Sequence, residues 1–221
     1  TAGLFQNQKE INDWIAAGNG IYQADVKPGD VKYVDVNHDG VINASDKVDL
    51  GNGLPKYTFG FNFSLAWKGF DLSANFTGAA GFQIAQSYRD PSSSQANYSR
   101  RILKRWTGEG TSNEIPRVTY GDVGNWLFSD LYLQDGDYIR LQNLTMGYDF
   151  KKLISWKGLS KMRLYFQVQN LFTLTKYDGM DPEIGSFNGT DGNSSDSWVS
   201  GVDMGYYPHP RTFIVGLNLA F

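Results

Sequence analysis

The sequence predicts an all-β chain whose strands form a segment of a large antiparallel transmembrane β-barrel. Apolar and polar residues alternate with a period of two over several stretches, which predicts strands with one apolar face. These stretches exceed the roughly 5–6 residues usual for strands in soluble proteins and approach the roughly 9–11 that cross a bilayer. The connections between them alternate between short and long, as the turns and loops of membrane barrels do.

The composition agrees with a strand-rich protein and excludes several functions. Of 221 residues, 25 are Gly and 15% are aromatic, which favours turns and strands. The absence of Cys excludes disulfide scaffolds, Cys-ligated zinc and thiol catalysis, and two His are too few for a multi-His metal site. The net charge of −3 argues against nucleic acid as a partner, because nucleic-acid-binding proteins usually carry a basic surface.

The N-terminal region, residues 1–56, is predicted to be mostly irregular. Residues 7–17 carry apolar side chains at helical spacing and are followed by Gly18, which predicts one short helix. The chain begins at Thr1, without an initiator Met or an apolar leader, so we expect a fragment or a processed piece of a longer protein.

Five strands are predicted after residue 56. The first alternates Phe, Leu and Trp with small or polar residues, and a short turn at Lys68-Gly69 makes a hairpin with the second. Alternation in the third is imperfect, and a bulge near Asn143 accounts for this. The predicted strands are 57–67, 70–77, 138–150, 162–170 and 212–221.

The loop lengths predict which ends of the strands share a side of the membrane. With Phe221 on the periplasmic side, the long irregular regions 1–56, 78–137 and 171–211 are extracellular, and the turns 68–69 and 151–161 are periplasmic. A helix is expected near 95–106 within the first long loop. Because barrels need at least about eight strands, we expect these five to complete a larger barrel.

Two alternatives come from other classes of protein. The first is a soluble, secreted β-sandwich binding module stiffened by Ca²⁺, with one face of each strand buried and the other in water. The second is an enzyme fragment such as a glycoside hydrolase. No carboxylate pair or nucleophile motif is recognisable in the sequence, so no catalytic residue is predicted.

An Asp- and Asn-rich loop at residues 35–46 predicts a calcium site. Oxygen-bearing side chains occupy its positions 1, 3, 5 and 12, with Gly40 at position 6, which is the spacing of an EF-hand loop. Position 12 is Asp, as in the dockerin-type variant. A solvated turn is the alternative, because Asp, Asn and Gly favour turns. The predicted ligands of a structural Ca²⁺ are Asp35, Asn37, Asp39, the Val41 carbonyl and Asp46.

Three motifs accompany the predicted strands. They are G-x-P-x-x-x-x-G before a strand, Q-N-L-F-x-x-x-x-Y, and Y-P-x-P-R-T before a strand that ends in Phe. Together they resemble the late part of SusC/RagA-type TonB-dependent outer-membrane transporters. The resemblance covers essentially the whole chain, with stretches such as YIRLQNLTMGYDF and MRLYFQVQNLFTLTKYDGMDPE.

This resemblance implies a role in nutrient import across the outer membrane of a Gram-negative bacterium. The complete transporter would be a 22-stranded barrel with an N-terminal plug and a segment that contacts the TonB complex. It would act with a SusD-like surface lipoprotein, and its cargo would be oligosaccharides or peptides. The plug and the TonB-contact segment are not among these residues.

Aromatic residues in the predicted extracellular loops are candidates for cargo contact, since sugar recognition usually uses aromatic faces. The candidates are Trp106, Trp126, Trp198 and Tyr206; packing within the loops is the alternative for each. The terminal Phe221, after outward-facing apolar residues, is similar to the signal read by the machinery that assembles outer-membrane barrels.

Overall fold

A computed structural model of the protein describes residues 1–87, 100–119, 121, 124–154, 156–184 and 201–221. The chain divides into two compact units, Thr1–Gly51 with Ser87–Leu133 and Asn52–Gln86 with Gln134–Phe221. Residues 87–133, which the sequence places in a loop between strands, therefore belong with the N-terminal region. Among the described residues, no helix is long and apolar enough to cross a membrane.

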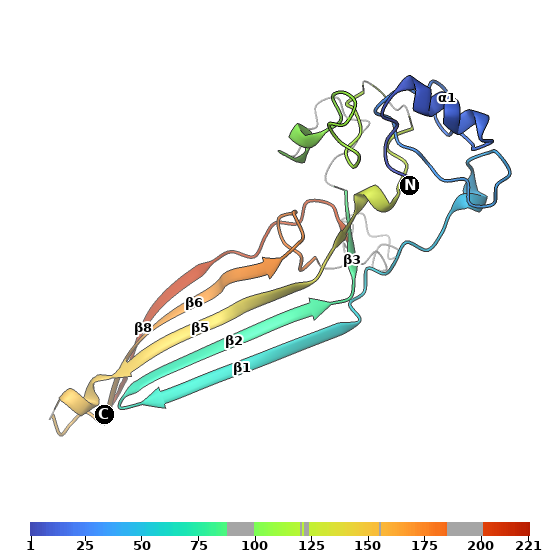
Figure 1. Ribbon diagram of the computed structural model, residues 1–221. Helices are drawn as coiled ribbons and strands as arrows, with labels where there is room; N and C mark the ends of the chain where they lie inside the picture. Colours follow the sequence, from blue (N-terminus) through green and yellow to red (C-terminus); the bar gives the residue numbers. More distant parts are fainter. Residues whose placement is uncertain (88–99, 120, 122–123, 155, 185–200) are drawn as a thin grey trace, which may run out of the picture. The chain divides into compact units, whose positions relative to one another are not determined.

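The second unit contains a five-stranded antiparallel sheet, shown in Figure 1. Each strand pairs with the next in the order β1–β2–β5–β6–β8. All five predicted strands are present. Their bounds are β1 Tyr57–Trp67, β2 Phe70–Ala80, β5 Tyr138–Asp149, β6 Lys161–Thr175 and β8 Thr212–Ala220.

Two strands are irregular, β5 near Asn143 and β6 at Asn170. The predicted bulge near Asn143 is confirmed, because the pairing of β5 with β6 shifts between Leu141 and Asn143. β6 continues to Thr175, beyond the predicted end at residue 170. Asn170 adopts a positive φ of 52° there, a conformation that Asn tolerates better than most residues. The distortion disrupts the alternation in the sequence without ending the strand.

The short connections lie together at one end of this sheet, which we call the turn end (Figure 1). It comprises the Lys68-Gly69 turn, the described residues of the β5–β6 connection (150–154 and 156–160) and the C-terminal end of β8. The Asp149 N–H donates to the Gly69 carbonyl at 2.8 Å, and the Ser160 N–H donates to the Ala220 carbonyl at 2.7 Å. A 3₁₀ turn, Phe150–Leu153, begins the β5–β6 connection.

At the other end of β2 the chain enters a small three-stranded sheet. Gly81, with φ 78°, separates β2 from β3 (Gln83–Gln86), which lies between β4 (Leu133–Asp135) and β7 (Val202–Asp203). β3 and β7 are parallel. A small buried cluster supports this region, formed by Ala79, Phe82, Ile84 and Tyr177.

The first unit is built around one helix and irregular chain. The predicted N-terminal helix is confirmed as α1 (Gln8–Ala16), and the Asn7 side chain caps it by accepting the Glu10 N–H. Of the helix expected at 95–106, residues 95–99 lie outside the described residues, and a 3₁₀ helix occupies Arg100–Lys104. The other 3₁₀ turns are Ala44–Asp46 and Asp130–Tyr132. Leu4, Val31 and Tyr33 form the core.

A buried ion pair connects distant segments of the first unit. Asp30 is fully buried, and its carboxylate accepts two hydrogen bonds from Arg117, at 2.7 and 3.1 Å. The Asn125 amide donates to the same carboxylate at 2.7 Å. A buried carboxylate requires such partners, because an unpaired charge loses its hydration without compensation.

Candidate functional site

One face of the five-stranded sheet is apolar on every strand, and we call it the apolar face. Cross-strand partners share a face, and the register pairs Phe61 with Phe76, Met146 with Phe166, and Phe166 with Val215. Phe61 is 58% exposed and Val215 is 71% exposed. The other exposed residues of this face include Tyr57, Phe59, Phe63, Leu65, Trp67, Phe70, Leu164, Phe172, Leu174, Phe213, Leu217 and Leu219.

The opposite face is lined mainly by small and uncharged polar side chains, and we call it the polar face. One row across the sheet pairs Asn62 with Asn75, Asn75 with Asn143, and Asn143 with Gln169. The Gln167 amide donates to the Asn143 side-chain oxygen at 3.2 Å. Other members are Thr58, Ser64, Ser73, Thr77, Thr145, Thr173 and Asn218.

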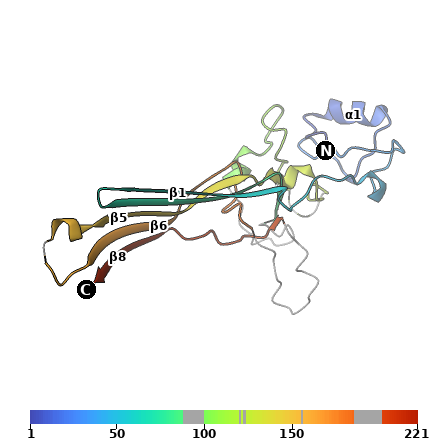
Figure 2. The same cartoon turned by 90° about the horizontal axis from the view of Figure 1, so that it is seen from below.

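The contrast between the two faces indicates the surroundings for which the sheet is built. Figure 2 shows the strands of the sheet as one layer. A sandwich would bury the apolar face beneath a second layer, but within the described part of the chain that face is exposed. Monomeric soluble proteins rarely expose contiguous apolar patches larger than a few hundred Å². An apolar face for lipid and a polar face for a wet interior are what the wall of a membrane barrel requires.

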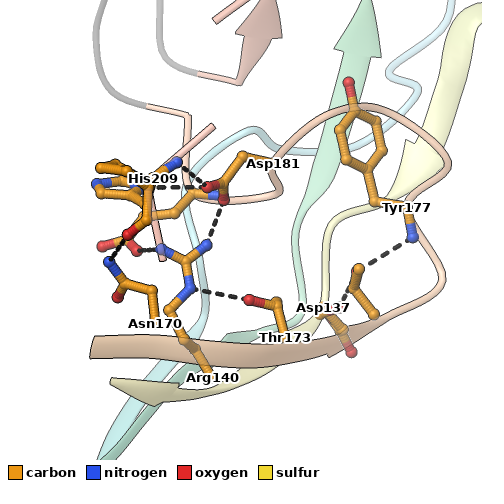
Figure 3. A network of polar contacts seen from close by, with 10 residues as sticks. Asp137, Arg140, Asn170, Thr173, Tyr177, Asp181 and His209 are labelled. Atoms are coloured by element: carbon orange, nitrogen blue, oxygen red, sulfur yellow. Dashed lines mark hydrogen bonds and ion pairs between the residues drawn. The ribbon is translucent and has the colours of Figure 1, made fainter. Parts of the chain in front are cut away.

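At the end of the sheet opposite the turn end, Arg140 of β5 forms the centre of a polar network, shown in Figure 3. Its side chain is only 3% exposed. The guanidinium donates to the Thr173 hydroxyl at 3.0 Å and to the Glu183 carboxylate at 2.8 Å. It also pairs with Asp181. The polar face thereby holds the chain that follows β6.

Asp181 joins a second segment to this network. Its carboxylate lies 3.0 Å from both the backbone nitrogen, which donates to it, and the ring Nδ1 of His209. Burial alone would raise the pKa of Asp181. The backbone N–H groups of His209 and Glu183, the His209 ring and the charge of Arg140 outweigh that effect and hold the pKa below its usual value.

A third contact completes this anchor. The Asn170 side chain donates to the Pro210 carbonyl at 3.1 Å. The structure thus brings together Q-N-L-F at 169–172, the D-P-E sequence at 181–183 and Y-P-x-P-R-T at 207–212. The sequence interpretation missed Arg140, Asp181 and His209 as a group. A charged residue inside an otherwise uncharged strand pattern was the available signal for Arg140.

The predicted calcium loop is closed by hydrogen bonds from its own backbone. Asp35 accepts the N–H groups of Asp39, at 3.2 Å, and Gly40, at 2.6 Å. Asp46 accepts those of Val36, at 2.9 Å, and Asn43, at 2.7 Å. The bond from Asn43 is the main cause that lowers the pKa of Asp46.

The remaining predicted ligands also take part in turn contacts. The Asn37 side chain accepts the Asp39 N–H at 3.0 Å, and the Val41 N–H donates to Asp39 at 2.9 Å. Where the structure describes the chain, no three His, Asp or Glu side chains converge in a group that could hold a metal ion. Calcium binding by Asp35, Asn37, Asp39, Val41 and Asp46 stays a prediction.

The predicted cargo-contacting aromatics fall in different parts of the chain. Trp106 packs against the core of the first unit, and its indole N–H donates to Gln6 at 3.2 Å. Trp126 is half-buried in the same unit. Tyr206, in the second unit, is half-buried and its N–H donates to Asp203 at 3.0 Å. Trp198 lies outside the described residues.

The predicted assembly residue is accessible. Phe221 is 79% exposed, and its ring lies 6.1 Å from that of Trp156 in an edge-on arrangement. This places an aromatic contact between the end of β8 and the β5–β6 connection.

The relatives found by comparison with known proteins are described as TonB-dependent receptors. No family model matches the chain. It is 34% identical to TonB-dependent receptor P3 of Formosa agariphila over 92% of this chain and 20% of that protein. It is 30% identical to receptor P26 of the same bacterium over 99% and 22%. It is 29% identical to TonB-dependent receptor SusC of Bacteroides thetaiotaomicron over 91% and 18%. The chain spans about a fifth of the length of these relatives.

Solved structures share the fold. The RagAB peptide importer in its closed-closed state matches all of this chain and 22% of the importer chain, with a TM-score of 0.63 and 21% identity. A structure of the RagAB peptide transporter matches 77% of this chain and 18% of that chain, with a TM-score of 0.58 and 24% identity. The predicted fold class and the predicted resemblance are confirmed.

Proposed function

This chain is homologous to a region of the SusC/RagA-type TonB-dependent receptors, and from that premise we propose that it forms part of the barrel wall of an outer-membrane nutrient importer. The observation that carries the proposal is the exposed apolar face opposite a polar face across five long strands. The apolar face contacts lipid, and the polar face lines the path of the cargo. The role is transport rather than catalysis.

The direction of the strands follows from their connections. The turn end faces the periplasm, and the long loops face the exterior, because outer-membrane barrels have short periplasmic turns. The Arg140 network then lies at the extracellular end and holds two segments of the β6–β8 loop to the wall, one at Asp181 and Glu183 and the other at His209. Phe221, at the periplasmic end, is the residue that the barrel assembly machinery reads.

The partners and cargo belong to the whole receptor. The rest of the barrel, the plug and the TonB complex complete the importer, and a SusD-like lipoprotein binds at the extracellular side. The cargo is an oligosaccharide or a peptide, which the uncharged amides and hydroxyls of the polar face can solvate. Trp106, Trp126, Trp198 and Tyr206 are the aromatic candidates for cargo contact, and loop 35–46 is the candidate site for a structural Ca²⁺.

Two adjacent residues of β1 provide the test. Phe63 lies on the apolar face and Ser64 on the polar face. In the full-length receptor, Phe63→Lys should destabilise the folded barrel by about 2–4 kcal/mol, because it places a charge in hydrocarbon, whereas Ser64→Lys should have little effect. Folding is measured in outer-membrane fractions by the heat-dependent electrophoretic mobility of the barrel. Equal tolerance of both variants, or a greater loss with Ser64→Lys, would contradict the proposal.

A further inference from the structure

Lysine side chains gather at the turn end of the sheet. Lys68 lies in the β1–β2 turn, Lys157 in the β5–β6 connection and Lys161 at the start of β6, and all three are exposed. The bond from the Asp149 N–H to the Gly69 carbonyl joins the two turns that carry them. In the part of the chain that the structure describes, no ion pair includes Lys68 or Lys157. Lys161 lies two residues before Arg163 on the same face of β6, and its charge acts on Asp71. The chain as a whole has a net charge of −3, so this positive end is a local feature.

The carboxylates near this end are already engaged. Asp71 pairs with Arg163 at 2.5 Å. Asp149 accepts the Lys151 N–H at 3.0 Å as the cap of the 3₁₀ turn. Lys68 and Lys157 are therefore left without a carboxylate partner among the described residues.

Aromatic rings lie at the same end of the sheet. Trp67 is 64% exposed, and the Lys68 ammonium lies 4.9 Å from the centre of its ring. Phe70 and Tyr148 are in ring contact at 4.5 Å, and Trp156 is exposed beside Phe221. Aromatic rings with lysines that extend toward water are characteristic of the boundary between hydrocarbon and headgroups.

We propose that the turn end binds the headgroups of anionic phospholipids in the periplasmic leaflet, through Lys68 and Lys157. This inference rests on the proposed function, which places the turn end at a bilayer surface. In an anionic headgroup no amine neutralises the charge of the phosphate. Such a headgroup can therefore pair with a lysine that has no carboxylate partner. Each lysine near an anionic surface contributes about fivefold in affinity, and salt weakens that contribution.

The test is a titration of the full-length receptor, in detergent, with phosphatidylglycerol, and separately with zwitterionic phosphatidylethanolamine, followed by native mass spectrometry. The variant carries Lys68→Gln and Lys157→Gln. A matched control carries Lys56→Gln and Lys176→Gln, just before β1 and just after β6 at the opposite end of the sheet. We expect phosphatidylglycerol affinity to fall about 25-fold in the turn-end variant and to stay near the wild-type value in the control. A variant with Lys68→Arg and Lys157→Arg should keep the wild-type affinity.

An unchanged affinity in the turn-end variant, an equal loss in both variants, or no preference of the wild type for phosphatidylglycerol would overturn this inference. The Phe63 and Ser64 comparison separates the two proposals. If the barrel tolerates both of those lysines, the proposed function fails. If it rejects Phe63→Lys alone while phosphatidylglycerol binding ignores the turn-end lysines, only the lipid inference fails.

Discussion

The Arg163 guanidinium of β6 reaches the Asp71 carboxylate of β2 across the strand that separates them, with contacts of 2.8 and 2.5 Å. The intervening residue is Gly147 of β5, where a Cβ would lie 2.6 Å from atoms of both side chains. Tyr165 similarly lies over Gly216 of β8. Glycines on the polar face thus leave space for side chains that extend across a neighbouring strand.

Replacing Gly147 with Ala should separate this ion pair. The added methyl group would collide with the Arg163 and Asp71 side chains, and overpacking of this kind typically costs about 1–3 kcal/mol. Gly60→Ala in β1 is the control, because its Cβ would be 3.7 Å from its nearest neighbour. Urea unfolding of the receptor, followed by Trp fluorescence, measures both. Equal stability of the two variants would show that the Asp71–Arg163 contact needs no glycine.

The loop anchor at Asp181 should loosen in acid. The lowered pKa of Asp181 means that its stabilising contribution is present above the unfolded value near 3.9 and is lost as pH falls through the folded pKa. Hydrogen exchange of residues 176–184, corrected for the intrinsic rate, should therefore increase below about pH 4. Asp181→Asn should weaken protection at neutral pH and remove this acid dependence. Asp178→Asn, in the same loop, should retain it; an identical acid response in both would contradict the assignment.

Among the ion pairs of the first unit, the buried Asp30–Arg117 pair and an exposed pair should differ in their contribution to stability. Asp30→Asn leaves Arg117 without its buried partner, which should cost about 3–5 kcal/mol. The exposed Asp25–Lys27 pair, at 2.7 Å, should contribute at most about 1 kcal/mol, so Asp25→Asn is the control. Limited proteolysis of residues 1–51 measures the opening of this unit. Equal cleavage rates in the two variants would show that Asp30 does not hold it.

Calcium should stabilise loop 35–46 if the predicted ligands bind it. Titration of the wild type with Ca²⁺ should slow proteolysis within this loop, and Asp39→Ala should abolish the response, because Asp39 is the ligand at position 5. Asp49→Ala, just outside the loop, is the control. The same response to Ca²⁺ in wild type and Asp39→Ala would reject the site.

Several elements were predictable because their determinants are local. The alternation that starts at Phe59 specifies both the strand and the face that each side chain occupies. Asn7 and Gly18 bracket α1 by capping and by stopping the helix. The bulge at Asn143 was visible as a break in alternation. The extension of β6 beyond Asn170 could not be predicted. The distortion at Asn170 interrupts the alternation in the sequence, and the end of a strand would interrupt it in the same way.

The sequence by itself determined the strands, their faces and the kinship with TonB-dependent receptors, since each depends on residue order along short stretches. Only the tertiary structure decided that residues 87–133 belong with the N-terminal region, and that Arg140 gathers Asp181, Glu183 and, through Asp181, His209. It also showed that Arg163 crosses Gly147 to meet Asp71. The physical reason is that such contacts are between residues tens of positions apart, where chain folding sets the distances and periodicity carries no information.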